Sequence, residues 1–89
     1  MSYFTYAIYS DKYQKIYIGF TRNLDERLFD HNVRAKKGYT LKFRPWRIIY
    51  DEEFATESDA RIREKQLKTA KGREFIHKLI GESNKSTGG

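Results

Sequence analysis

The stretch YIGFTRNLDERLFDHN, residues 17–32, decides the fold of this 89-residue chain. Its first part is a short run of β-favouring residues that reaches Gly19, and its second part has the apolar spacing of a helix. Asn23 is a good helix N-cap, and Glu26 three residues later completes a pattern similar to a capping box. The stretch therefore predicts a strand, a turn and a helix that carries Arg27 and His31 one turn apart.

The residues before this helix predict a β-hairpin. Residues 3–9 and 15–20 are rich in aromatic and β-favouring types, and the polar segment 10–14 lies between them. Side chains alternate between the two faces of a strand, so the pairing register decides which residues share a face. We expect paired residue numbers to sum to an even value, because that register collects the large apolar residues on one face. Tyr9 and Tyr17 then share the other face.

The first helix has a clear apolar periodicity, whereas the segment after it has only weak signals of secondary structure. Leu24 and Leu28 lie one turn apart and define the buried stripe of the helix, which Phe29 or Val33 is expected to join. The helix should end before Gly38. Residues 34–44 form a basic connection with aromatic residues among the cations, and they have only weak structural signals.

The second half of the chain predicts a third strand and more helix. Pro45 leads into a strand that ends near residue 54, and Thr56 opens a helix over about 57–70. We expect Gly72 to end this helix and a short helix to follow over 73–80. The order β-β-α-β-α-α predicts an α+β fold, a small three-stranded antiparallel sheet flanked by helices. Residues 1–81 are expected to form a single domain, with a disordered tail over 82–89.

Composition narrows the function. The chain has no cysteine, which excludes disulfides, thiolate metal sites and thiol catalysis. We expect no signal peptide, because the N-terminus has no basic region followed by an apolar run, and no membrane span, because no apolar run has the required length. The absence of cysteine fits a cytoplasmic protein. The formal net charge of +6 favours a polyanionic partner, with nucleic acid the leading candidate.

Glu64 is the most unusual residue of the predicted second helix. It lies four residues after Ala60 and three before Leu67, on the inward stripe, where an unpaired carboxylate is costly. One interpretation is an ordinary ion pair with Lys68 at i+4. The other is a carboxylate held at the rim of a cleft to bind a divalent cation through oxygen. The pattern does not separate these interpretations.

Four blocks of sequence, in order, resemble the GIY-YIG endonuclease family. The first is the pair Ala7-Ile8-Tyr9 and Tyr17-Ile18-Gly19, and the second is the run 19–32 with its glycine, Thr-x-Asn-Leu segment, arginine and histidine. Residues 44–50 (RPWRIIY) resemble the family's third-strand block. Residues 60–68 (ARIREKQLK) resemble the helix that carries a metal-binding glutamate. The resemblance covers residues 3–80.

The resemblance implies a metal-dependent nuclease similar to the N-terminal catalytic domain of the GIY-YIG excinuclease. It implies one Mg²⁺ or Mn²⁺ ion held by Glu64. The catalytic positions that it implies are Tyr9, Tyr17, Arg27, His31 and Glu64. Two positions depart from the family pattern: Ala7 replaces a glycine of the signature, and Phe20 stands where the excinuclease has a lysine. That cation is therefore absent or supplied by Arg22.

These residues suggest a division of labour in phosphodiester hydrolysis. Arg27 offers a planar, charged fork to the non-bridging phosphate oxygens. Tyr17 is the candidate general base, and Tyr9 would orient the attacking water or the phosphate. A free phenol has a pKa of about 10, so its phenolate would need stabilisation. His31 would assist as proton acceptor or phosphate ligand, and which group takes the proton stays open.

A set of cations is expected to contact the nucleic-acid backbone: Arg22, Lys36, Lys37, Lys42 and Arg44. The interleaved aromatics Tyr39, Phe43 and Trp46 could stack on bases or fold back into the core, and we expect the second outcome for Trp46.

Three hypotheses follow for the function. The leading one is an endonuclease that cleaves DNA, in repair or processing of non-standard DNA structures. The alternative is a nucleic-acid-binding module on the same scaffold, either non-catalytic or activated by a protein partner or targeting subunit. The third is a structural or interaction domain, which would leave the four-block resemblance unexplained.

Overall fold

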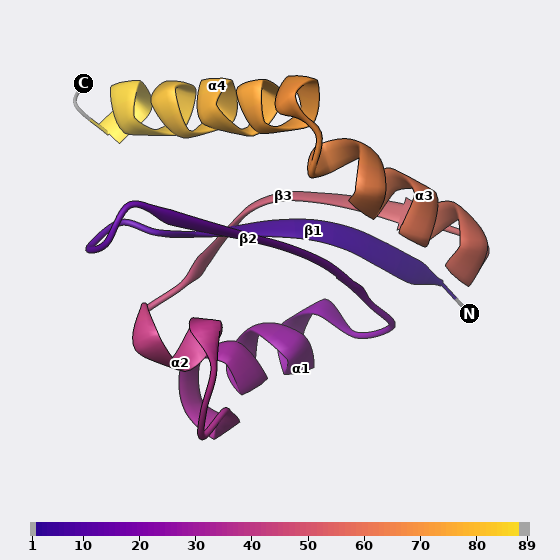
Figure 1. Ribbon diagram of the computed structural model, residues 1–89, viewed down its shortest axis with the longest axis horizontal. Coiled ribbons are helices and arrows are strands. Elements are labelled where there is room, and N and C mark those ends of the chain that lie inside the picture. Colours follow the sequence, from indigo (N-terminus) through magenta and orange to yellow (C-terminus); the bar gives the residue numbers. More distant parts are fainter. Residues whose placement is uncertain (1, 88–89) are drawn as a thin grey trace.

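A three-stranded antiparallel sheet forms the central layer of the computed structural model, which describes residues 2–87 (Figure 1). The strand order is β2-β1-β3, so β1 is the central strand. The strands are β1 (Tyr3–Ser10), β2 (Lys15–Thr21) and β3 (Arg47–Phe54). The helical elements are α1 (Leu24–Phe29), the π-helical turn η1 (Asp30–Arg34), α2 (Tyr39–Lys42), α3 (Glu57–Leu67) and α4 (Ala70–Thr87). The predicted α+β class and antiparallel sheet are confirmed.

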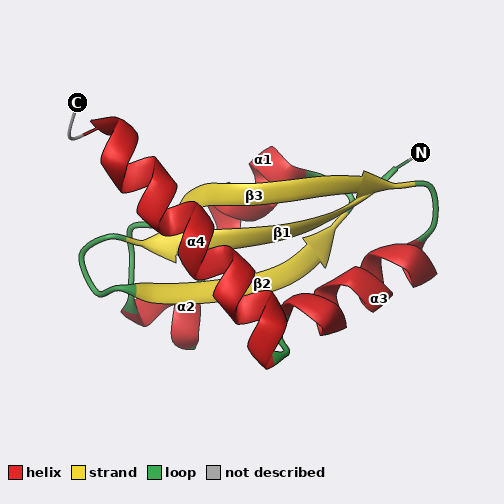
Figure 2. Ribbon diagram, turned by 90° about the horizontal axis from the view of Figure 1, so that it is seen from above, coloured by secondary structure: helices red, strands yellow, loops and turns green. Residues whose placement is uncertain are grey.

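Helices cover both faces of the sheet. The short helices α1 and α2 lie on one side, and α3 and α4 lie on the other, with α4 crossing the strands (Figures 1 and 2). One core cluster centres on Tyr6, Ile8 and Trp46, on the side of α1 and α2. The other joins residues of β1 and β2 to apolar residues of α3 and α4. The expected burial of Trp46 is confirmed, and its indole Nε1 donates to the Thr40 carbonyl at 2.7 Å.

The predicted hairpin register is wrong. Strand β1 pairs with β2 so that Tyr6 faces Gly19 and Ile8 faces Tyr17, and the paired numbers sum to an odd value. The prediction assumed that one face of the sheet carries the apolar residues. Because helices cover both faces, large apolar residues are needed on both, and the odd register supplies them. Tyr9 and Tyr17 therefore lie on opposite faces.

Helix α1 begins as predicted but ends differently. The Asn23 side chain accepts a hydrogen bond from the Glu26 amide at 3.1 Å, which confirms the N-cap. The expectation that Phe29 or Val33 joins the buried stripe is wrong, since these side chains are 46% and 58% exposed. The helix widens into η1 at Asp30, and the wider turn changes which residues face inward. His31 is buried instead.

The helices after β3 also differ from the prediction in their bounds. The Thr56 hydroxyl caps α3 by accepting from the Asp59 amide, but α3 ends at Leu67 rather than near 70. Gly72 does not break a helix: it lies inside α4, where an added Cβ would stand 2.3 Å from the Gln66 carbonyl oxygen. The absence of a side chain therefore lets the first turn of α4 pack against the end of α3.

Residues 82–87, part of the tail that is expected to be disordered, continue α4 as far as Thr87. Residues 88 and 89 lie outside the described part of the chain. No helix within residues 2–87 combines the length and apolarity that a membrane crossing requires. The single domain over residues 1–81 stays a prediction.

Candidate active site

Three aromatic side chains meet on the sheet face that α1 covers. Tyr6 comes from the central strand, Tyr17 from β2 and His31 from η1. The Tyr6 hydroxyl lies 2.8 Å from His31 Nε2, and the rings of Tyr17 and His31 have centroids 4.9 Å apart. His31 is only 3% exposed. The π-helical turn, a type of irregularity common at functional sites, thus places an imidazole against two phenols.

Gly19 makes room for this cluster. It stands across from Tyr6 in the hairpin, and an added Cβ would lie 2.8 Å from the Tyr6 hydroxyl and 3.2 Å from Cε1 of Tyr17. The Tyr6 side chain is 2% exposed and therefore has little room to move away. A side chain here would displace the Tyr6 ring from His31, so the glycine allows the two tyrosines to lie side by side.

Arg27 projects from α1 toward the two phenols. Burial alone would lower the pKa of Arg27, but hydrogen bonding and charge interaction with Tyr6, and then with Tyr17, outweigh it and raise that pKa. Its contact with Asp30 is long, at 4.0 Å, and Asp30 binds Arg34 at 3.0 Å instead. The guanidinium is therefore not held by a close carboxylate, and its side chain stays 43% exposed, open to an incoming anion.

The surroundings of Tyr6 and His31 keep both groups neutral near pH 7. Burial raises the pKa of Tyr6 to about 12, although the Arg27 charge opposes this shift. Burial, followed by repulsion from Arg27, lowers the pKa of His31 to about 4, against the weaker effect of Asp30. A neutral imidazole has one nitrogen that accepts, so in the Nδ1–H tautomer His31 Nε2 accepts a hydrogen bond from the Tyr6 hydroxyl.

The lowered pKa of His31 predicts a loss of stability in acid. The unfolded chain takes up a proton near pH 6.5, whereas the folded protein takes it up only near pH 4. The free energy of unfolding is therefore fully retained above pH 6.5. As the pH falls toward 4, protonation of His31 in the unfolded chain lowers it by about 3 kcal/mol in total. Urea unfolding of the wild type and the His31→Gln variant at several pH values measures this. The difference between their free energies of unfolding should change across pH 7 to 4. Parallel curves would contradict the prediction.

Glu64 reaches the same region from α3. Its carboxylate is the weakest of the named influences that raise the pKa of Tyr6, so Glu64 lies within electrostatic range of the cluster, although α3 packs on the side of the sheet opposite α1 (Figure 1). The expected pair with Lys68 is present at 3.1 Å through Oε2, and the Glu64 side chain is 19% exposed. Both interpretations of Glu64 are thus compatible with its position.

The donor set fits a mostly hydrated divalent cation. Among the described residues there is no group of three or more His, Cys, Asp or Glu side chains that could cage a metal. Mg²⁺ is commonly bound by one or two carboxylates together with water and substrate phosphate, so a single carboxylate beside an anion-binding arginine suffices. Glu64 is the residue that would hold the ion.

The structure does not place Tyr9 with the other predicted catalytic residues. It brings Tyr17, Arg27 and His31 together, with Glu64 in electrostatic reach, but the Tyr9 side chain belongs to the core beneath α3 and α4. The reason is the odd hairpin register. Tyr6 occupies the position expected for Tyr9, and sequence reasoning missed it. The polar segment between the strands could have predicted the odd register. A four-residue turn over 11–14 pairs Ser10 with Lys15, and these numbers sum to an odd value.

The predicted backbone-binding cations separate into two groups. Lys36, Lys37 and Lys42 are exposed on and around α2, as expected. Arg44 instead has a structural role, because its guanidinium donates to the carbonyls of His31 and Ala35, both at 2.7 Å. These hydrogen bonds satisfy two carbonyls in and just after η1, and they support the turn that positions His31. Arg22 is exposed and lies over the Tyr3 ring.

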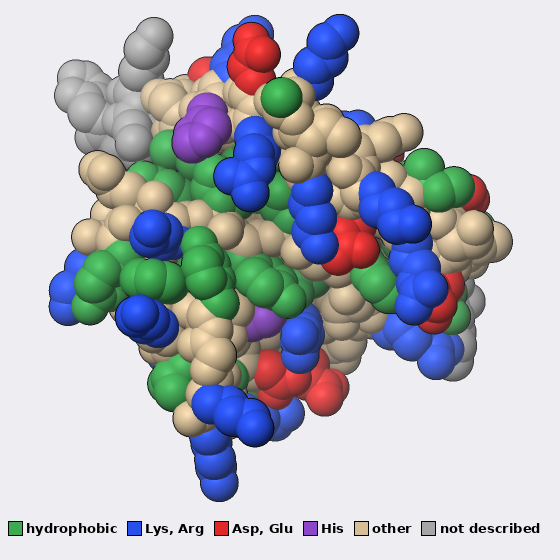
Figure 3. All heavy atoms as spheres, in the orientation of Figure 1, with side chains coloured by type: hydrophobic (Ala, Val, Ile, Leu, Met, Phe, Trp, Pro, Cys, Tyr) green, Lys and Arg blue, Asp and Glu red, His purple; other side chains and the backbone are tan. Residues whose placement is uncertain are grey.

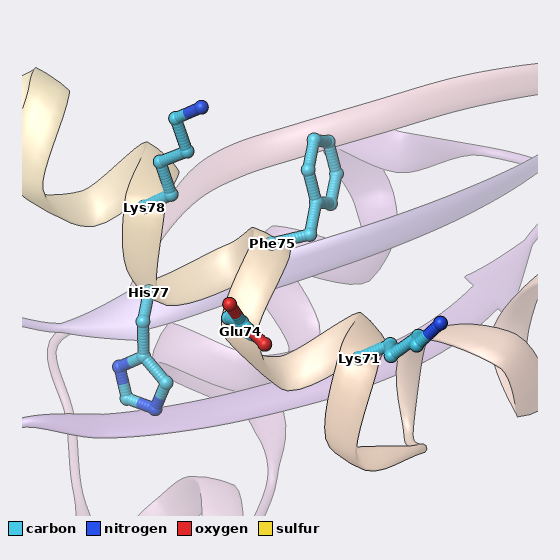
Figure 4. A pocket seen from close by; sticks show the side chains of 5 residues that line it. All are labelled: Lys71, Glu74, Phe75, His77 and Lys78. Carbon is cyan, nitrogen blue, oxygen red and sulfur yellow. The ribbon is translucent and has the colours of Figure 1, made fainter.

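A shallow hollow on α4 lies on the opposite side of the sheet from α1 (Figures 1 and 4). Its lining residues are Lys71, Glu74, Phe75, His77 and Lys78. Their side chains splay along the helix in different directions rather than converging on one point (Figure 4). This hollow is therefore separate from the cluster around Tyr6.

Comparisons with known proteins agree with the sequence resemblance. The sequence profile of the GIY-YIG catalytic domain matches residues 2–78. The UPF0213 protein of Staphylococcus haemolyticus is 36% identical over 58 residues, which are 65% of this chain and 71% of that protein. The UPF0213 protein of Staphylococcus saprophyticus is 34% identical over 67 residues, which are 75% of this chain and 80% of that protein.

A solved structure shares the fold. The solution NMR structure of a UPF0213 protein from Bacillus halodurans aligns with a TM-score of 0.52 and 22% identity, and the alignment covers 89% of this chain and 85% of that chain. At this level of identity the likeness concerns the arrangement of strands and helices.

Proposed function

Because the chain belongs to the GIY-YIG catalytic domain family, a family of nucleases, we propose that it is a divalent-metal-dependent endonuclease that hydrolyses phosphodiester bonds in DNA. The observation that carries this proposal is the position of Arg27 against the hydroxyls of Tyr6 and Tyr17, beside a buried neutral His31. An open guanidinium next to two phenols and an imidazole supplies an anion site and a proton path together.

Arg27 binds the phosphate in this mechanism. Its fork donates to the non-bridging oxygens and offsets the charge that grows on them as water attacks phosphorus. The same contact also raises the basicity of His31. Arg27 is the second largest cause of the lowered His31 pKa, so a phosphate that offsets the Arg27 charge makes the imidazole a better base.

Tyr6 and His31 carry the proton. The Tyr6 oxygen accepts the proton of the attacking water while its own proton passes to His31 Nε2, 2.8 Å away. The phenol therefore need not exist as a free phenolate, which its raised pKa disfavours. The Tyr17 ring packs at a tilt against His31 and presents its hydroxyl to Arg27, so it orients the water and the guanidinium.

Glu64 would hold the divalent cation, which when bound stabilises the phosphoryl oxygen and the leaving 3′ oxygen as a Lewis acid. The Lys68 ammonium, 3.1 Å from Glu64 Oε2, occupies one carboxylate oxygen and leaves the other for coordination. We infer from the resemblance to the GIY-YIG excinuclease that the substrate is branched or damaged DNA. The absence of cysteine fits action in the reducing cytoplasm.

Metal-dependent nicking tests the proposal. With Mg²⁺ or Mn²⁺, the purified protein should nick supercoiled plasmid or flap DNA. Chelation and the Glu64→Gln variant should each abolish nicking, because both remove the ion and neither removes a core contact. Glu74→Gln on α4 is the matched control, since Glu74 is an exposed carboxylate that lines the hollow on α4, away from the cluster around Tyr6.

The outcomes separate the hypotheses. Equal nicking by the wild type and Glu64→Gln would overturn the metal assignment. DNA binding without nicking under any metal condition would leave the non-catalytic binding module as the better account.

A further inference from the structure

We propose that an aromatic platform beside the active site binds the unpaired bases of single-stranded nucleic acid, and that strand scission occurs next to them. The platform consists of Tyr13, Tyr39 and Phe43. This inference rests on the proposed nuclease function, because it names the form of substrate that the same site would take.

The platform is formed by two segments that are distant in sequence. Tyr13 lies in the turn between β1 and β2, and Phe43 directly follows α2. Their ring centroids are 5.5 Å apart, and those of Phe43 and Tyr39 are 4.9 Å apart, both with edge-to-face geometry. Tyr13 and Tyr39 are 42% and 43% exposed, which is high for tyrosines in a ring cluster. Exposed rings of this kind are available to stack on bases.

Cations surround the same rings. Lys15 and Lys42 place their ammonium groups 5.2 and 5.7 Å from the centre of the Phe43 ring, and Lys12 lies 5.3 Å from that of Tyr13. Residues 12–22 and 34–47 contain no acidic residue. In the space-filling view, hydrophobic side chains form a band over the edge of β2 with Lys and Arg side chains along it (Figure 3). Aromatic rings with positive charge beside them favour single-stranded nucleic acid.

The platform leads directly to the cleavage residues. The Tyr39 ring lies 6.3 Å from that of Tyr17, which lies 4.9 Å from His31. The Tyr39 hydroxyl donates to the Ile16 carbonyl at 3.3 Å and ties α2 to β2. A base stacked on Tyr39 would therefore place a neighbouring phosphate near Arg27, and Tyr13 would hold a base farther along the strand. Paired bases within a duplex cannot present their faces to these rings, so the platform favours an unpaired strand.

Binding in the absence of divalent metal tests this inference without relying on cleavage. Fluorescence anisotropy in EDTA should show that Tyr13→Ala weakens binding of a labelled oligothymidine about tenfold or more, since stacking accounts for that much per base. Tyr13→Phe should bind as the wild type does. Phe75→Ala is the matched control, because Phe75 is another exposed aromatic with a cation over its ring, on α4. Binding of a blunt duplex should not change in any variant.

A second variant separates stacking from charge. Lys15→Gln should reduce the slope of log Kd against log salt by about 0.7, the value for one single-strand phosphate contact, whereas Tyr13→Ala should leave the slope unchanged. Comparing oligothymidine with oligouridine assigns the sugar, and tighter binding of either supports the single-strand site. Unaltered oligothymidine binding by Tyr13→Ala, or an equal loss of duplex binding, would overturn the inference. Tyr13-dependent binding by a wild type that never nicks would overturn the nuclease proposal alone.

Discussion

Replacing Arg27 with lysine is expected to lower the rate of nicking by about 10²–10³-fold, the usual cost of losing one donor to a developing oxyanion. Lysine keeps the positive charge but has no planar fork, so it cannot donate to two phosphate oxygens while also contacting the phenols. Arg27→Ala should lower the rate at least as far. Single-turnover nicking at saturating protein measures the effect, and Arg73→Ala on α4 is the matched control for loss of a surface cation.

The Arg27 variant also has a readout that does not depend on activity. The Arg27 charge lowers the pKa of His31 and that of Tyr6. In Arg27→Ala, NMR titration should therefore find the His31 pKa above the value of about 4 in the wild type. An unchanged His31 pKa together with a large loss of activity would mean that the variant acts through misfolding or through a site elsewhere.

The second large effect distinguishes two tyrosines three positions apart. Tyr6→Phe is expected to lower nicking by about 10²–10⁴-fold, because it removes the hydroxyl that relays the proton to His31. Tyr9→Phe should leave the rate unchanged, since Tyr9 packs in the opposite core. Each variant removes one oxygen atom and keeps the ring, so the pair forms a close comparison.

Stability controls are needed for this pair. Tyr6→Phe leaves a buried His31 nitrogen without its partner, which costs about 1–3 kcal/mol, so both variants should be assayed well below their unfolding midpoints. If Tyr9→Phe lost activity and Tyr6→Phe kept it, the assignment from the hairpin register would be wrong.

Much of the architecture followed from local sequence signals. The two helix caps, at Asn23 and Thr56, were predictable because each cap depends on residues three positions apart. The antiparallel hairpin and the third strand were predictable from β-favouring runs between turn formers. The family resemblance, carried by blocks in the right order, indicated the positions of Tyr17, Arg27, His31 and Glu64.

The tertiary structure alone decided which N-terminal tyrosine lies with Tyr17, Arg27 and His31. A one-residue shift of register moves every side chain of a strand to the opposite face, and local sequence does not reveal that helices cover both faces. Packing likewise decided that His31 is buried and neutral, because its pKa depends on desolvation and on Arg27, which folding brings close. The sequence by itself determined the α+β class, the order of the strands and main helices along the chain, and the family resemblance. Long-range contacts decided that Tyr6, rather than Tyr9, lies against His31.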